Sequence, residues 1–187
     1  MVARARGWDR QRMLRPCALV PPERLTVRPI RPSDNDALLD LFERMSDRSR
    51  RRRFLSTKPS LSTRELAYFT EVDHRRHEAL VAVAPGGCLA GVARYACAPG
   101  DDAEADVAFA VADDWQGQGI GTGLARRLIE HARQNGIARL TASTLADNRP
   151  AHRLLRGLGF TVHGADSGGV DLELRLEAAA AGTRLAA

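Results

Sequence analysis

The chain has 187 residues, a net charge of +5 and 44% hydrophobic residues, which suffices for one domain with one apolar core. No apolar run approaches the ~20 residues of a membrane span, and the arginine-rich start lacks the apolar core of a signal peptide. We therefore expect a cytoplasmic protein with no membrane partner. A basic chain attracts anions, so nucleic acid, an acidic protein and an anionic cofactor are all candidate partners.

The three cysteines, Cys17, Cys88 and Cys97, are odd in number and lack a C-x-x-C spacing. This pattern favours free thiols in a reducing compartment over a disulfide framework. No histidine pair has the spacing of a metal-binding helix, and no cysteine supplements one. We therefore expect no metal site, and we interpret all five histidines as surface or structural residues.

Hydrophobic periodicity and turn signals divide the chain into three parts. Residues 1–24 are expected to form a flexible arginine-rich tail, residues 25–177 one domain, and residues 178–187 a second flexible tail. Strands are expected at 25–30, 78–84, 88–95, 104–111, 137–145, 160–163 and 170–176. Helices are expected from Pro32, over 47–54, after Ser62, after the glycines at 117–123 and over 150–157. These elements predict an α+β fold, in which helices flank a mixed, mostly antiparallel sheet.

Glycines occupy every second position from Gly117 to Gly123, between a strand that ends at Val111 and an amphipathic helix. A strand, a glycine loop and a helix N-terminus together point free backbone N–H groups at a phosphate. A Walker A loop is excluded, because the only lysine of the chain is Lys58. A dinucleotide fingerprint is excluded, because its last glycine would fall on Thr122 or Leu124. A purely structural turn is the other interpretation.

The loop contains Gln-x-x-Gly-x-Gly, at Gln116, Gly119 and Gly121, and resembles the acyl-CoA pyrophosphate loop of the GNAT N-acetyltransferase superfamily. Farther along, an Asn-x-x-Ala helix that starts at Asn148 and closes on Gly159-Phe160 resembles the second GNAT signature. The resemblance covers roughly residues 25–177. It implies the GNAT fold and acetyl-CoA as co-substrate. It also implies that strands 104–111 and 140–145 splay apart to admit the pantetheine arm of the cofactor.

The same resemblance implies a set of cofactor-binding residues. The loop residues would bind the phosphates, mostly through backbone N–H groups. Asn148 would hydrogen-bond the pantetheine arm, or cap its helix, and Arg153 would approach the phosphates, or carry a solvated charge. The complete expected set is Val111, Gln116, Gly117, Gln118, Gly119, Gly121, Thr122, Asn148 and Arg153.

An amine that attacks a thioester must first lose a proton, because an alkylammonium has a pKa near 10.4. Alternation along strand 104–111 places Glu104 and Asp106 on one face, above Ala108 and Ala110. GNAT relatives usually carry a Glu ten residues before the loop's Gln or Arg, and that position here is Asp106. Because Asp is one methylene shorter, a water relay is expected. Glu104 is the alternative base, and two solvated carboxylates are the third interpretation.

Many GNAT enzymes also use a Tyr on the last helix to protonate the leaving thiolate. That position here is Leu155, so this acid is missing. Either the thiolate leaves unaided, or another donor such as Ser143 reaches it.

Arg48 and Arg50 to Arg53 form a basic run on the second predicted helix. A solvated helix face is one interpretation, and a docking surface for an acidic protein is another. Nucleic acid is the least favoured partner, because no aromatic residues interleave with the arginines.

Segments 27–34, 49–54 and 78–83 resemble the Pat-like branch of GNAT, bacterial protein lysine acetyltransferases that modify acyl-CoA synthetases. This resemblance implies a protein lysine as acceptor, with an acyl-CoA synthetase as an example. One alternative is a small-molecule amine acetyltransferase. Another is an acyl-CoA-binding regulatory module without turnover, which the missing Tyr and the shortened carboxylate would suit.

Overall fold

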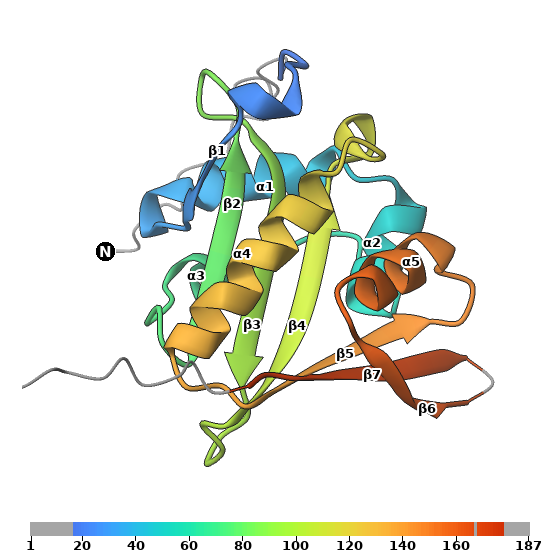
Figure 1. The fold of residues 1–187 in the computed structure, drawn as a ribbon. Helices are drawn as coiled ribbons and strands as arrows, with labels where there is room; N and C mark the ends of the chain where they lie inside the picture. Colours follow the sequence, from blue (N-terminus) through green and yellow to red (C-terminus); the bar gives the residue numbers. More distant parts are fainter. Residues whose placement is uncertain (1–16, 167, 178–187) are drawn as a thin grey trace, which may run out of the picture.

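The computed structural model describes residues 17–166 and 168–177. Its centre is a seven-stranded sheet with the order β1-β2-β3-β4-β5-β7-β6, in which only β4 and β5 run parallel (Figure 1). The predicted α+β class with a mixed, mostly antiparallel sheet is confirmed. The strands are β1 (Thr26–Pro29), β2 (His77–Val83), β3 (Leu89–Cys97), β4 (Glu104–Val111), β5 (Arg139–Leu145), β6 (Thr161–Ala165) and β7 (Gly169–Arg175).

Helices cover both faces of this sheet. The helices are α1 (Asn35–Glu43), α2 (Asp47–Phe54), α3 (Thr63–Thr70), α4 (Ile120–Gln134) and α5 (Arg149–Gly157). Short 3-10 turns precede β1, α1 and the glycine loop before α4. Helix α4 lies across β2, β3 and β4 on the near face in Figure 1, and α1 lies behind the same strands. The α4 face that the periodicity predicted is buried, because Leu124, Leu128, Ile129 and Ala132 all pack into the core.

The ladder between β4 and β5 is very short. It consists of the pairs Glu104↔Arg139, Ala105↔Leu140 and Asp106↔Thr141, after which the two strands diverge (Figure 1). Both strands continue beyond the last pair, β4 to Val111 and β5 to Leu145. The implied splaying of the two central strands is therefore present. Helix α2 contacts both β4 and β5, and so it lies across their separation.

The prediction of three free thiols is wrong for two of them. Cys17 and Cys88 form a disulfide across 71 residues of sequence, with their Cα atoms 5.8 Å apart, whereas Cys97 is free. Cysteine spacing could not reveal this pair, because only the folded chain brings residue 17 to the β2–β3 turn. Of the expected flexible tail at residues 1–24, residues 17–24 instead have defined structure, with Cys17 in this disulfide and a 3-10 turn at Pro22–Arg24. Residues 1–16 and 178–187 lie outside the described residues.

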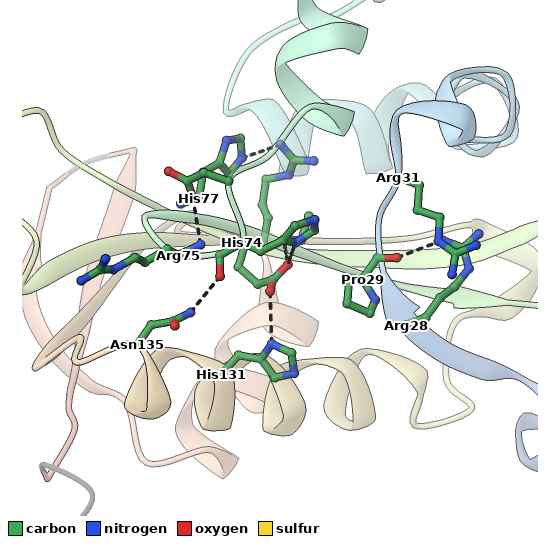
Figure 2. A network of polar contacts seen from close by, with 12 residues as sticks. Arg28, Pro29, Arg31, His74, Arg75, His77, His131 and Asn135 are labelled. Carbon is green, nitrogen blue, oxygen red and sulfur yellow. Dashed lines mark hydrogen bonds and ion pairs between the residues drawn. The ribbon is translucent and has the colours of Figure 1, made fainter.

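Three histidines join a polar network beside α4 (Figure 2). The carboxylate of Glu78, on β2, is 2% exposed and lies 2.8 Å from Nδ1 of His74 and 3.2 Å from Nδ1 of His131. Nε2 of His77 lies 3.3 Å from Nη1 of Arg94. These histidines make contacts within the fold, as the sequence interpretation expected. No helix in the described part of the chain is long and apolar enough to cross a membrane.

Candidate active site

The glycine loop has the backbone geometry of an anion site. Gly117 and Gly119 have φ angles of +76° and +79°, which favour glycine, and Gly119 stands directly before the first residue of α4. The first intrahelical bond is donated by the N–H of Gly123 to the Gly119 carbonyl. Within the described residues, no group accepts from the N–H groups of Ile120, Gly121 and Thr122. A helix N-terminus with several free N–H groups attracts phosphate.

A cleft of about 550 Å³ opens between this loop, the upper part of β4 and α5, which is a volume typical of small-molecule sites. Eight of the nine expected cofactor residues line it: Val111, Gln116, Gly117, Gly119, Gly121, Thr122, Asn148 and Arg153. The structure therefore brings together residues that lie up to 42 positions apart in the sequence, from 111 to 153. The ninth, Gln118, is not among the lining residues, because its amide turns away and donates to the carbonyl of Asp114 at 3.2 Å.

The side chain of Gln116 shapes the loop from within. Its Nε2 donates to the Val111 carbonyl and to Oδ1 of Asp113, both at 3.1 Å, and lies 3.3 Å from Oγ of Ser49 on α2. These contacts tie the end of β4, the glycine loop and α2 together. Gln116 therefore fixes the position of the loop in addition to lining the cleft.

Asn148 shows that its two expected roles are compatible. It is 8% exposed, and its Oδ1 accepts a capping hydrogen bond from the N–H of Ala151 at 3.4 Å. Its amide nitrogen, Nδ2, makes no hydrogen bond to the described residues, and the Asn148 side chain lines the cleft. The side-chain oxygen thus caps α5, while the amide nitrogen can donate a hydrogen bond to a ligand.

The basic run contributes to the cleft, which the sequence analysis missed. Met45, Ser49, Arg52 and Arg53 all line it from α2 and the turn before it. The spacing of Ser49, Arg52 and Arg53 places them on one helix face, so periodicity was the available signal. It could not show that this face is turned toward the strands. Arg48, Arg50, Arg51 and Lys58 instead line an adjacent groove of about 430 Å³, and Arg52 borders both.

Asp106 lies where the two central strands separate. Its Oδ1 is 3.5 Å from Oγ1 of Thr141, in the last pair of the β4–β5 ladder. Displacement of water by the surrounding protein raises the pKa of Asp106, and nearby Asp171 adds to this, whereas the Arg53 charge and the Thr141 hydroxyl favour the ionised form. Asp106 is four residues before Ala110, which lines the cleft, or about 13 Å along the strand.

The other positions considered for the general base or the general acid contact neighbouring residues or lie in the core. Glu104 pairs with Arg139 across the ladder, and the same guanidinium lies 3.6 Å from Glu173. Ser143 donates to Oδ1 of Asp171 at 2.7 Å. Leu155 is 3% exposed and belongs to the core, so this position supplies no proton. Of the two carboxylates on β4, only Asp106 is therefore without a salt bridge to the described residues.

The composition of the site indicates which kind of ligand it can bind. No cluster of three or more His, Cys, Asp or Glu side chains that could hold a metal ion occurs in residues 17–166 and 168–177. The groups present are backbone N–H donors that could bind a phosphate, a cleft along β4 where the strand pair has separated, and one exposed carboxylate, Asp106, farther along the same strand. This arrangement suits an anionic cofactor with a long arm and a proton acceptor near the end of that arm.

Comparisons with known proteins agree with this geometry. The family model of the acetyltransferase (GNAT) domain matches residues 24–161. Acetyltransferase PA5475 of Pseudomonas aeruginosa is 34% identical over 137 residues, which are 72% of this chain and 73% of that protein. Acetyltransferase Pat of Mycolicibacterium smegmatis is 36% identical over 71% of this chain, but the match spans only 40% of Pat.

Among solved structures, the GNAT domain of S. lividans PAT superposes with a TM-score of 0.76 at 32% sequence identity. The match covers 81% of this chain and 90% of that domain. Acetyl-CoA is the acetyl donor of GNAT acetyltransferases, and the cleft is lined by residues that the sequence predicted to bind it. The chain therefore belongs to the GNAT family, as an acetyl-CoA-dependent N-acetyltransferase that resembles the Pat branch.

Proposed function

We propose that the chain transfers acetyl from acetyl-CoA to the ε-amine of a protein lysine, with Asp106 as the general base. The observation that carries this proposal is the position of Asp106 at the last β4–β5 pair. With the pyrophosphate at the N-terminus of α4, the pantetheine arm runs along β4 from Val111 toward Asp106. The thioester then lies beyond Ala110, toward this carboxylate.

The proton transfer follows from the environment of Asp106. A lysine ammonium gives one proton, through a water molecule, to the Asp106 carboxylate, whose raised pKa makes it a stronger base. The free amine attacks the thioester carbonyl, and the tetrahedral intermediate collapses with cleavage of the C–S bond. Coenzyme A leaves as a thiolate, which is a good leaving group because a thiol has a pKa near 8.5. The nitrogen of the intermediate carries a second proton, which passes to this thiolate and leaves a neutral amide and coenzyme A, while Asp106 releases the first proton to water. The residue at 155 therefore need not be an acid.

The surface beside the cleft supports a protein acceptor. The groove lined by Arg48, Arg51 and Lys58 borders the cleft through Arg52, and its basic residues outnumber its acidic ones, Asp47 and Asp147. Its basic side chains suit a folded partner with acidic groups around the target lysine. A small polyamine would need an acidic acceptor pocket, and the cavity that adjoins the cleft is lined by Arg53 and Arg94 instead. The Pat relatives support the same acceptor class.

The test is thiol release from acetyl-CoA with a panel of acceptors. The panel contains a bacterial acetyl-CoA synthetase, lysine peptides and simple polyamines. We expect release that depends on the synthetase or the peptides, with the acetyl group found on a lysine by mass spectrometry. Release with polyamines alone would overturn the protein acceptor and favour a small amine. Binding of acetyl-CoA with no release for any acceptor would favour the regulatory module.

A further inference from the structure

A second, smaller cavity lies under α1, α2 and α3, next to the cofactor cleft. It has a volume of about 30 Å³, room for about two water molecules or one carboxylate group. Its walls are mostly apolar, and the exceptions are the guanidinium groups of Arg53 and Arg94. Met45, Arg53 and Ala110 border both the cavity and the cleft, so the two spaces adjoin.

Neither arginine has an anionic partner. In the described part of the chain, no carboxylate forms a salt bridge with Arg53 or Arg94. Arg94 is 6% exposed, and its hydrogen bonds go to neutral groups, the Phe69 carbonyl at 2.8 Å and His77 at 3.3 Å. Its guanidinium also lies 4.3 Å from the centre of the Phe69 ring. A buried cation without a counter-charge is costly unless something compensates it.

The two charges also act on each other. Burial and, to a smaller extent, the charge of Arg53 together lower the pKa of Arg94 to about 9. Burial lowers the pKa of Arg53 to about 10, against the opposing influence of Asp106. An anion that entered the cavity would relieve both effects, and its hydrogen bonds would be strong because the apolar walls exclude water.

The cavity lies on the same side of the sheet as Asp106. In the β3–β4 ladder Arg94 pairs with Ala108, and Ala96 pairs with Asp106. Paired residues share a face, and so do alternate residues of one strand, so the side chains of Arg94 and Asp106 leave the sheet on the same side. An acceptor whose amine approaches Asp106 can therefore present a neighbouring group to the arginines.

We propose that Arg53 and Arg94 form an anion subsite that binds a carboxylate carried by the acetyl acceptor close to its reactive amine. The proposal deepens, and rests on, the proposed transfer of acetyl to an amine near Asp106. The carboxylate has two possible sources, an acidic side chain beside a target lysine and the free α-carboxylate of an amino acid. Arg53, at the boundary with the cleft, meets the carboxylate first, and Arg94 closes the inner end.

The test uses matched acceptors at saturating acetyl-CoA. Lysine peptides with Glu beside the target lysine are compared with the same peptides carrying Gln, and free lysine is compared with lysinamide. We expect kcat/KM to be roughly ten- to a hundredfold higher for the members that carry the carboxylate. A preference in the peptide pair assigns the acidic side chain, and a preference in the lysine pair assigns the α-carboxylate.

Variants then connect the preference to the two arginines. Arg53→Met and Arg94→Met are each expected to reduce the ratio between matched acceptors toward one. Arg127→Met, at an exposed position on α4 that lines neither cavity, cleft nor groove, is expected to leave the ratio unchanged. Equal rates for matched acceptors with the unmodified protein would overturn the proposal, as would an unchanged ratio in both Arg53→Met and Arg94→Met.

A binding measurement separates this inference from the proposed function. Glutarate is titrated by calorimetry into protein saturated with coenzyme A, so that the phosphate loop is already occupied. We expect binding that Arg53→Met weakens at least tenfold, whether or not any amine is acetylated. No binding by the unmodified protein, or equal binding by Arg53→Met, would contradict the subsite. Because Arg94 also holds α3 to β3, thermal unfolding of Arg94→Met is measured first, and Arg53→Met carries the test if it unfolds.

Discussion

Asp106 and Thr141 form the last pair of the parallel β4–β5 ladder, and Thr141 Oγ1 lies 3.5 Å from Asp106 Oδ1. One strand pair thus ends, and the cofactor gap begins, at the side chain proposed as the base. The hydroxyl of Thr141 can donate to the carboxylate and orient it toward the gap. The position of Asp106 therefore depends on where the ladder stops.

Asp106→Asn is expected to reduce kcat about 10²- to 10⁴-fold, because it removes the proton acceptor while preserving the shape of the side chain. The dissociation constant for coenzyme A should be unchanged, since Asp106 does not line the cleft at the loop. Steady-state kinetics and calorimetry measure the two quantities. Glu104→Gln is the matched comparison, because Glu104 is paired with Arg139. If Glu104→Gln lost as much activity as Asp106→Asn, the assignment of the base would be wrong.

The dependence of activity on pH should reflect the ionisation of Asp106. The carboxylate must be ionised to accept a proton, so activity should fall as the pH decreases through the raised pKa of Asp106. Thr141→Val removes a hydrogen bond that favours the ionised form, so this acid limb should move to higher pH. Ser143→Ala, a similar deletion two residues along β5, should leave the limb in place, because its hydroxyl bonds Asp171. A limb that shifts equally in both variants would argue against Asp106.

Gly119→Ala is expected to raise KM for acetyl-CoA about tenfold or more. An L-residue at the φ of +79° costs about 1–2 kcal/mol and would shift the N–H groups at the start of α4. Gly123→Ala is the control, because its added Cβ meets nothing within 4 Å and its backbone is helical. That variant should raise stability by about 0.5–1 kcal/mol and leave KM unchanged. Acetyl-CoA saturation curves and thermal unfolding distinguish the two.

Variants of Asn148 can distinguish its role as helix cap from its expected contact with the cofactor. Asn148→Ala should lower stability by about 1 kcal/mol and also raise KM for acetyl-CoA, since it loses the capping oxygen and the amide donor. Asn148→Asp keeps a capping oxygen and loses only the donor. It should therefore unfold at close to the original temperature and still show the higher KM. An unchanged KM for acetyl-CoA in Asn148→Asp would mean that Asn148 only caps α5 and does not contact the cofactor.

Reduction of the Cys17–Cys88 disulfide should destabilise the fold. The bond closes a loop with a sequence separation of 71, and the chain-entropy estimate for such a loop is about 4 kcal/mol. Denaturant unfolding with and without reductant measures the difference, and Cys88→Ser should reproduce it. Cys97→Ser should behave like the unmodified protein, because Cys97 is free. Equal stability in both redox states would show that the bond constrains little of the unfolded chain.

The sequence alone determined the local structure and the cofactor chemistry. The apolar stripe of α4, the capping box of Ser62 and Glu65, and the hairpin turn at 85–87 all depend on residues close together in the chain. The glycine loop belongs to the same class, because positive φ and free N–H groups are properties of a few consecutive residues. For that reason the sequence could point to a set of nine residues, of which eight line one cleft in the structure.

Only the tertiary structure decided which distant groups meet. It showed that the β4–β5 ladder ends at Asp106 and that Arg139 forms a salt bridge with Glu104. It also showed that Arg52 and Arg53 of α2 line the cleft. It also joined Cys17 to Cys88 and placed Arg94 in the same cavity as Arg53. Periodicity gives the face of an element but not its neighbour, because packing is set by the whole core. Contacts between elements far apart in the chain, and the pKa values that depend on them, therefore appear only when the fold is known.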